Sequence, residues 1–372
     1  MRSRKCGILL AAVLLISLAA CDADSDPTAD ITVVEESADA ESADAESADA
    51  QEEVVVDEGP EYVSYLTGLE VSEEYADRRP VAIMIPNDNY GALPHVGIGS
   101  AEIVYQCLAE GGYTRLMAIF DAQTFETLDK IGPIRSSRLY YAYYAMEYDA
   151  LYMHFGQSYL AEDFLYSSAI DNINCLVVSA YTRDSSRTSP NNAFTSGTLI
   201  NQYTGSLGYS DTHDDDYTGT FLFADEEVNL TDGVDAYTVT PYYPIDKPWF
   251  EYNEEDGLYY RYQYGSEHVD SATGEQLCYK NIIIISVPTS TVDSHGYLAL
   301  SVAGSGSGYY VTNGKAISIT WSKSSETAVT HYYDSEGNEL ALNTGKTFVC
   351  VESPDYFSKV TFEAGETEEA SE

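Results

Sequence analysis

Short apolar runs alternate with amphipathic segments in the part of the chain that begins near residue 80. Strands are expected at residues 81–86, 113–121, 150–154 and 175–179, where apolar and β-branched residues gather. Helices are expected between them, at residues 100–109, 136–147, 159–166 and 195–203. Strands that alternate with helices favour an α/β domain built on a mixed sheet.

The pattern changes after residue 217, where aromatic and β-branched runs follow one another. The segment PWFEYNEEDGLYYRY predicts two strands around an Asp-Gly turn, KNIIIISV a short buried strand, and residues 315–321 with 329–342 another hairpin. We therefore expect an α+β protein. An N-terminal mixed-sheet α/β domain would occupy residues 62–215, and a mostly β C-terminal domain residues 216–362.

The first twenty residues have the features of a secretory signal peptide. Arg2, Arg4 and Lys5 precede an apolar run that ends in Leu-Ala-Ala-Cys at Cys21. The run is shorter than the roughly 20 residues of a spanning helix, and small residues precede the cysteine. Cys21 is therefore predicted to carry a lipid that holds the exported protein to the outer face of the cytoplasmic membrane.

An acidic segment follows the predicted lipid anchor. Sixteen acidic residues, no lysine or arginine and three consecutive ESADA units lie between Asp22 and Glu61. Like charges repel and little apolar surface is available, so residues 21–61 are predicted to be a disordered tether. The acidic tail at residues 363–372 is of the same kind.

Charge and tyrosine content restrict the partners. The formal net charge is −43, which disfavours nucleic acid and leaves the lipid to supply the attachment to the membrane. The chain has 33 tyrosines and two tryptophans. Tyrosine combines a flat apolar face with a polar tip, so these residues favour either recognition of partners and sugars or filling of strands.

Metal, cofactor and disulfide motifs are weak. GSGSG at residues 304–308 joins strand-like segments and opens no helix, which predicts a turn rather than a phosphate loop, and no cofactor is expected. No CxxC motif or Cys/His cluster with zinc spacing occurs. Four cysteines remain after Cys6 and Cys21. If disulfides form, sequence order favours the pairs Cys107–Cys175 and Cys278–Cys350. Cys107 and Cys175 lie in apolar runs, which favours buried free thiols at these two positions instead.

Several segments resemble the YerB-like lipoproteins, and the resemblance covers about residues 62–362. It implies an exported, lipid-anchored, two-domain protein of unknown biochemical function, and it carries over no catalytic residues. The matching segments are PVAIMIPN, AEIVYQCLAEGGYTR, KIGPIRSSR and YDALYMHFG in the first domain, and TGEQLCYKNIIIISV, GSGSGYYVTNGKAISITW and YYDSEGNELALNTGKTFV in the second.

Arginines gather in one part of this acidic chain. Outside the signal peptide there are eight, and seven of them lie between Arg78 and Arg187. The sequence GPIRSSR at residues 132–138 is a Gly-Pro turn that leads into a predicted helix. Backbone N–H groups at that helix start, together with the guanidinium groups of Arg135 and Arg138, would hold an anion.

The predicted anion site contains six residues. His154 ends a buried strand inside the same stretch, and a purely structural histidine is the alternative reading there. The arginines have an alternative too, because Glu102, Asp121, Glu147 and Asp149 could supply them with structural partners. The candidate ligand-binding residues are Glu110, Arg115, Arg135, Ser136, Arg138 and His154.

Two functions from different classes fit these residues. The favoured one is a non-enzymatic lipoprotein of the cell envelope that binds an anionic ligand or a protein partner through its N-terminal domain. The alternative is an envelope enzyme that acts on a phosphorylated or glycan substrate, with Glu110 as acid or base and the arginines as an anion clamp. No serine-hydrolase elbow of the form GxSxG occurs in the first domain, and no catalytic residue is assigned.

Overall fold

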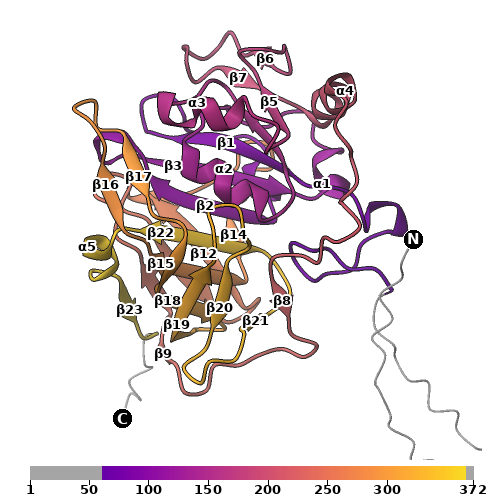
Figure 1. Ribbon diagram of the computed structural model, residues 1–372. Helices are drawn as coiled ribbons and strands as arrows, with labels where there is room; N and C mark the ends of the chain where they lie inside the picture. Colours follow the sequence, from indigo (N-terminus) through magenta and orange to yellow (C-terminus); the bar gives the residue numbers. More distant parts are fainter. Residues whose placement is uncertain (1–60, 366–372) are drawn as a thin grey trace, which may run out of the picture. The chain divides into compact units, whose positions relative to one another are not determined.

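The computed structural model describes residues 61–365 (Figure 1). Cys21 and the predicted signal peptide, tether and most of the acidic tail lie outside the described residues. Within the described part, no helix is both long and apolar enough to cross a membrane. The α-helices are α1 (Ala122–Phe125), α2 (Leu139–Met146), α3 (Tyr159–Leu165), α4 (Gly197–Leu207) and α5 (Pro354–Phe357), and the 3-10 helices are η1 (Glu73–Tyr75), η2 (Ile98–Ser100) and η3 (Glu110–Gly112).

The main sheet is mixed and contains strands from both halves of the chain. β1 pairs antiparallel with β3 and parallel with β4, while β2 pairs antiparallel with β3 and parallel with β22. The predicted α+β class is therefore confirmed. In spatial order the strands are β20 (His331–Tyr333), β19 (Lys315–Lys323), β18 (Gly304–Thr312), β15 (Asn281–Ser286), β22 (Thr347–Glu352), β2 (Ile103–Leu108), β3 (Thr114–Phe120), β1 (Val81–Asn87), β4 (Leu151–His154) and β5 (Asn172–Asn174), with β9 (Val234–Asp235) paired to β19.

The two halves of the chain meet at one pair of strands. β22 of the C-terminal half lies beside β2 of the N-terminal half, in register from Ile103 opposite Thr347 to Cys107 opposite Val351. All six residues of each strand are buried. The sheet thus continues from one half into the other without an open edge between them.

A second sheet belongs to the C-terminal half. The predicted aromatic hairpin is present in it as β11 and β12, which pair antiparallel around the turn at residues 254–257. Its strands are β13 (Ser266–Glu267), β12 (Leu258–Gln263), β11 (Trp249–Asn253), β10 (Thr238–Thr240) and β23 (Thr361–Glu363), with β14 (Cys278–Tyr279) on β12; the remaining pairs are β16 (Thr289–Thr291) with β17 (Leu298–Leu300), β21 (Ala341–Leu342) with β8 (Leu222–Phe223), and β6 (Thr182–Arg183) with β7 (Ala193–Phe194).

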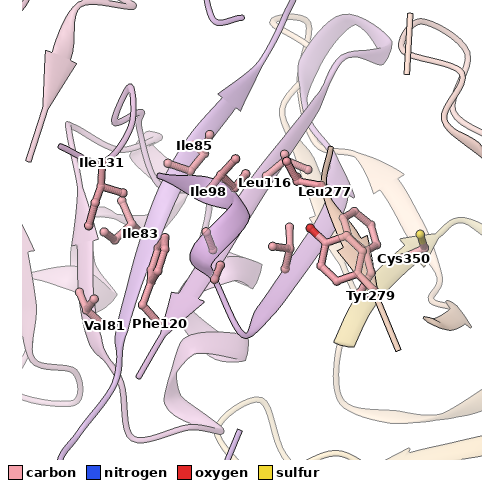
Figure 2. Packing of buried hydrophobic residues seen from close by; sticks show 14 of the residues in the cluster. Val81, Ile83, Ile85, Ile98, Leu116, Phe120, Ile131, Leu277, Tyr279 and Cys350 are labelled. Atoms are coloured by element: carbon pink, nitrogen blue, oxygen red, sulfur yellow. The ribbon is translucent and has the colours of Figure 1, made fainter. Parts of the chain in front are cut away.

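Both faces of the main sheet are covered. On one face, α2 and α3 pack on the alternate residues of β1, β2 and β3 that include Met84, Tyr105 and Met117. On the other face, residues such as Ile83 and Phe120 meet the segment before α2 and aromatic residues of the second sheet. Figure 2 shows this second core, with Ile131 near Ile83 at one end of the cluster and Leu277 and Tyr279 at the other.

Three elements differ from the sequence-based expectation. Residues 103–108 form strand β2 and not a helix, because IVYQCL is buried on both faces and a strand of that kind shows no alternation. Residues 175–179 are not a strand. The Asn174 side chain accepts a hydrogen bond from the Leu176 nitrogen (3.0 Å), the Asn174 carbonyl accepts one from the Val177 nitrogen (2.8 Å), and the chain turns there.

The GSGSG segment is the third difference, since it begins strand β18 and is not a turn. Gly306 lies opposite Trp321 in the antiparallel pair of β18 and β19. A Cβ atom at Gly306 would lie 2.6 Å from the Trp321 Nε1 atom, and one at Gly308 would lie 2.8 Å from the Ile284 carbonyl oxygen. Glycine is required here because the indole and a neighbouring strand approach the backbone closely.

The four cysteines of the described part are free thiols. Cys107, Cys175 and Cys350 are buried and Cys278 is half-buried, so neither of the two pairings considered from sequence order is formed. Burial raises the pKa of the Cys175 thiol to about 12, which keeps the thiol protonated at neutral pH. Cys107, Cys175 and Cys350 act as small apolar core residues.

β22 ends in a buried carboxyl group, and this group should make stability depend on pH. Glu352 Oε1 accepts a hydrogen bond from the Tyr242 nitrogen (2.7 Å), Oε2 has no partner among residues 61–365, and burial raises the pKa of Glu352 from 4.5 to about 8. The folded state therefore holds this proton more tightly than the unfolded state. The resulting stability is fully present below pH 4.5 and is lost as the pH rises toward 8.

We expect Glu352→Gln to reduce the loss of stability between pH 5 and pH 8. This one group can account for at most about 1.4 kcal/mol of unfolding free energy per pH unit. Urea unfolding of the wild type and the variant at several pH values measures the difference, and Glu255→Gln at an exposed position serves as the control. An unchanged pH slope in Glu352→Gln would show that the carboxyl group is already ionised in the folded protein.

Candidate functional site

Two tyrosine hydroxyl groups of α2 form hydrogen bonds with the backbone that carries the candidate site residues. Tyr140 donates a hydrogen bond to the Leu108 carbonyl (2.5 Å), and Tyr141 accepts one from the Cys107 nitrogen (2.9 Å) and bonds to the Arg115 carbonyl. These bonds join the helix to the end of β2 and the start of β3. They fix the position of η3, the short connection that carries Glu110.

Arg138 lies immediately before α2 and forms a two-pronged ion pair with Glu110. Its Nη2 atom is 2.5 Å from Glu110 Oε2, and its Nε atom contacts the other carboxylate oxygen. Nη1 donates to the Ser137 carbonyl (2.7 Å). Burial alone would raise the pKa of Glu110, but the hydrogen bond and charge of Arg138, together with Arg115, hold that pKa below its ordinary value. Each of the three guanidinium nitrogens of Arg138 thus donates to a protein acceptor.

Arg115 projects from β3 and approaches the same carboxylate as Arg138. Nη1 donates to the Ser136 carbonyl, and Nη2 lies 3.8 Å from Glu110 Oε2. The side chain is 12% exposed. Burial and the charge of Arg138 lower the pKa of Arg115 to about 10, so the guanidinium is still charged at neutral pH.

Arg135 is different from its neighbours. Its backbone nitrogen donates to the Met84 carbonyl (2.8 Å), which anchors the residue beside β1. Its half-buried side chain has no ion-pair partner in the range 61–365. Burial lowers the pKa of Arg135, the charge of Asp88 acts in the opposite sense, and Arg138 adds to the lowering. An arginine in this condition has donors available for a ligand.

Arg135 lines a surface pocket of about 370 Å³. The pocket lies where the end of β1, the start of β3 and the connection between β2 and β3 meet Pro190 and Asn191. Its volume falls at the lower end of the roughly 300–1,000 Å³ that small-molecule sites occupy. The charged and polar residues of its lining are Asn87, Asp88, Glu110, Thr114, Arg115, Arg135 and Asn191, and the aromatic ones are Tyr90 and Tyr113.

Three of the six candidate residues therefore line one pocket, namely Glu110, Arg115 and Arg135. Arg138 adjoins it through Glu110. Ser136 contributes its backbone carbonyl to Arg115 and does not belong to the lining. Backbone N–H groups at the start of α2 were expected to hold the anion. No residue of α2 lines the pocket, and the cations of the lining are the side chains of Arg115 and Arg135.

His154 lies apart from this pocket. Its Nδ1 atom donates to the Gly156 carbonyl (2.9 Å), and Nε2 lies 3.1 Å from Asn172 Oδ1. The ring is fully buried, and burial lowers the pKa of His154. These contacts link β4 to β5 and favour a structural histidine.

Asp88, Tyr90, Tyr113 and Asn191 are pocket residues that the sequence analysis did not select. Asp88 and Tyr90 follow directly on the apolar run PVAIMIPN, and polar residues at the end of a buried strand are a usable signal. Asn191 gives no such signal. Its Nδ2 atom meets Asp88 Oδ1 at 3.3 Å across more than a hundred residues of sequence, and only the fold brings the two together.

A buried polar network lies beneath the pocket and starts at its lining residues. Asp246 of the C-terminal half accepts hydrogen bonds at Oδ2 from Asn87 Nδ2 (3.1 Å), Thr114 Oγ1 (3.2 Å) and Gln106 Nε2 (2.6 Å). Gln106 Oε1 in turn accepts from Arg261 Nη2 (2.8 Å). All five side chains are at most 2% exposed. The floor of the pocket is thus bonded directly to the second domain.

From Arg261 the network continues through two buried histidines, His268 and His95. His95 Nε2 donates to the Pro86 carbonyl (2.7 Å), so His95 Nδ1 accepts from His268 Nε2 (2.9 Å), and His268 Nδ1 accepts from Arg261 Nη1 (2.5 Å). This assignment requires both rings to be neutral. Burial lowers the pKa of His95 to about 3 and that of His268 well below its ordinary value, which agrees with the assignment.

Comparison with known proteins identifies the family to which this chain belongs. The model of the family described as "Protein of unknown function (DUF3048) N-terminal domain" matches residues 66–210, and that described as "Protein of unknown function (DUF3048) C-terminal domain" matches residues 238–349. The chain is a member of this two-domain, YerB-like family, as its sequence motifs predicted. The family description states no activity, and the domain limits of 62–215 and 216–362 stay predictions.

A relative and a solved structure come from Bacillus subtilis. The protein named "Putative lipoprotein YerB" of strain 168 is 28% identical over 305 residues, which are 80% of this chain and 88% of that protein. The crystal structure of the YerB protein from Bacillus subtilis is similar with a TM-score of 0.71 and 26% identity, over 81% of this chain and 99% of that chain. The likeness therefore extends over both domains.

Proposed function

We propose that this protein is a non-enzymatic binding protein of the cell envelope, whose N-terminal domain holds an anionic group in the Arg135 pocket. The observation that carries the proposal is the contrast among three neighbouring arginines. Arg138 is occupied by Glu110, Arg115 bonds to a backbone carbonyl and lies near the same carboxylate, and Arg135 lines the pocket without an ion pair in the described part of the chain. A phosphate or carboxylate group would supply the missing partner.

The state of Glu110 supports binding over catalysis. A general acid needs a pKa raised toward neutrality, whereas Arg138 and Arg115 hold the pKa of Glu110 below its ordinary value. The carboxylate is also fixed by two hydrogen bonds to Arg138. These interactions make Glu110 a residue that orients Arg138 and Arg115.

The proposal places the protein outside the cytoplasmic membrane, anchored by lipid on Cys21. The sequence Leu-Ala-Ala-Cys after a basic, apolar leader supports it, and the Bacillus subtilis relative carries the name of a lipoprotein. Cys21→Ala is expected to move the protein from the membrane fraction to the soluble exported fraction. If the variant is processed and stays in the membrane fraction, the anchor is not on Cys21.

Anion-dependent stabilisation tests the pocket. We expect phosphate or acetate to raise the melting temperature of the protein lacking residues 1–21, since a ligand at 100 times its Kd stabilises by about 2.7 kcal/mol. Arg135→Ala should abolish this gain and keep the ligand-free melting temperature close to that of the wild type, because no ion pair in the described part is lost.

The matched control is Arg183→Ala, since Arg183 is exposed and lies outside the pocket lining. It should retain the full anion effect. The proposal fails if no anion stabilises the wild type, or if Arg183→Ala and Arg135→Ala reduce the effect equally.

A further inference from the structure

We infer that the anion held at Arg135 belongs to an acidic sugar unit, a sugar ring that carries a carboxylate or a phosphate. This inference rests on the proposed function and adds the class of ligand. It depends on three features of the pocket that an anion alone does not require: a carboxylate beside the cation, an aromatic pair on the lining, and a volume suited to one ring.

The first feature is the mixed charge of the pocket. Asp88 and Glu110 line it together with Arg135, and the charge of Asp88 acts on Arg135. The charge of Glu110 is paired with Arg138, whereas Asp88 has no ion pair among residues 61–365, so a bare phosphate ion would gain from the Arg135 guanidinium and be repelled by Asp88. A ligand that places its anion at Arg135 and hydroxyl groups near Asp88 converts that repulsion into hydrogen bonds.

Asp88 has the capacity to accept such bonds. Its Oδ1 atom accepts from the Tyr90 nitrogen (3.0 Å) and from Asn191 Nδ2 (3.3 Å). Its Oδ2 atom has a weaker contact with the same Asn191 nitrogen, at 3.4 Å. A carboxylate can accept about four hydrogen bonds, so sugar hydroxyl groups can be added while the present bonds hold the carboxylate in position.

The second feature is the pair of tyrosines. Tyr90 and Tyr113 line the pocket, and their ring centroids lie 6.2 Å apart with the planes at 66°. Tyr90 is 78% exposed, so its ring face is accessible to a ligand. The C–H face of a sugar ring is apolar and packs on such an aromatic face, while the hydroxyl groups at its edge bond to polar neighbours.

The third feature is size. A volume of about 370 Å³ is small among ligand sites, which favours one ring over an extended chain. The unit can be a free sugar or the end of a glycan, because the exposed Tyr90 leaves one side open. Both sources present the same group to the pocket, and the experiment compares them.

Calorimetric titration of the protein lacking residues 1–21 tests the inference. The acidic-sugar probes are glucuronate, glucose 6-phosphate and a glucuronate-terminated tetrasaccharide. Glucose is the uncharged sugar, acetate and inorganic phosphate are the simple anions, and alanine carries a carboxylate without a sugar ring. We expect at least one acidic sugar to bind about tenfold or more tightly than acetate and phosphate, and glucose to bind weakest of the sugars. Similar affinity of glucuronate and the tetrasaccharide identifies a terminal unit, and loss of affinity in the tetrasaccharide identifies a free sugar.

Two variants separate this inference from the proposed function. Tyr90→Ala should remove the advantage of acidic sugars over simple anions, and Arg135→Ala should remove all anion binding. Tyr166→Ala is the control, because Tyr166 is 62% exposed and lies outside the pocket lining. If phosphate or alanine binds as tightly as the acidic sugars and Tyr90→Ala has no effect, the sugar assignment is wrong and anion binding stands. If no probe binds in an Arg135-dependent manner, both are wrong.

Discussion

Replacing Lys323 with methionine is expected to lower the free energy of unfolding by about 3–5 kcal/mol, because it leaves a buried carboxylate without its cation. The side chains of Lys323 and Glu147 are both 0% exposed and form an ion pair between β19 and the residue that follows α2. Glu147 also accepts hydrogen bonds from the Thr330 nitrogen (3.1 Å) and hydroxyl group (2.9 Å). Burial raises the pKa of Glu147, and Lys323 opposes that rise.

Lys315→Met is the matched control for this prediction. Lys315 lies on the same strand and pairs with Asp235 at 2.7 Å, but the two side chains are 36% and 51% exposed. Pairs of this kind contribute about 0–1 kcal/mol, so the control should change stability little. Urea unfolding measures both variants. Equal effects of the two substitutions would mean that the Lys323 pair does not stabilise the fold through its burial.

The second large effect is expected when the chain is divided between its halves. The fragment of residues 62–215 should not fold alone, because it lacks β22 and leaves the central strand β2 with an open, apolar edge. Phe348, Val349 and Val351 of β22 are at most 1% exposed. Burial of each such side chain contributes about 1.5–3 kcal/mol, so the three approach the roughly 5–15 kcal/mol of an entire domain.

Amide exchange of the fragment, compared with that of residues 62–365, provides the measurement. The longer chain contains both halves and should show slow exchange in β2, whereas the fragment should exchange throughout or precipitate. Addition of a separately expressed 216–365 chain is expected to restore protection. A soluble 62–215 fragment with protected β2 amides would show that the N-terminal half is an independent folding unit.

The sequence predicted the α+β class, the family and most elements, since these depend on local patterns. It failed at β2 because a strand buried on both faces has no alternation, and IVYQCL could be read as part of a helix. It failed at Gly306 because the need for glycine comes from Trp321 on the neighbouring strand. Both errors concern contacts between distant segments.

The candidate site could be predicted only in part, because it too depends on contacts between distant segments. The gathering of arginines identified Arg115, Arg135 and Arg138, but not which of them has a partner. That distinction depends on Glu110, which reaches Arg138 from a different element. The pairing of Asp88 with Asn191 and the network from Asn87 through Asp246 to Arg261 join residues that have no relation in sequence. Such contacts appear only once the sheet has been assembled.

Anomalous diffraction from crystals soaked in selenate gives the sharpest check on anion binding at Arg135, because selenate is a tetrahedral anion whose position can be located without ambiguity. We expect a selenium peak in the Arg135 pocket, within about 4 Å of the guanidinium, and its loss in Arg135→Ala crystals. Selenate peaks confined to other surfaces, with the pocket empty at saturating concentration, would contradict this expectation.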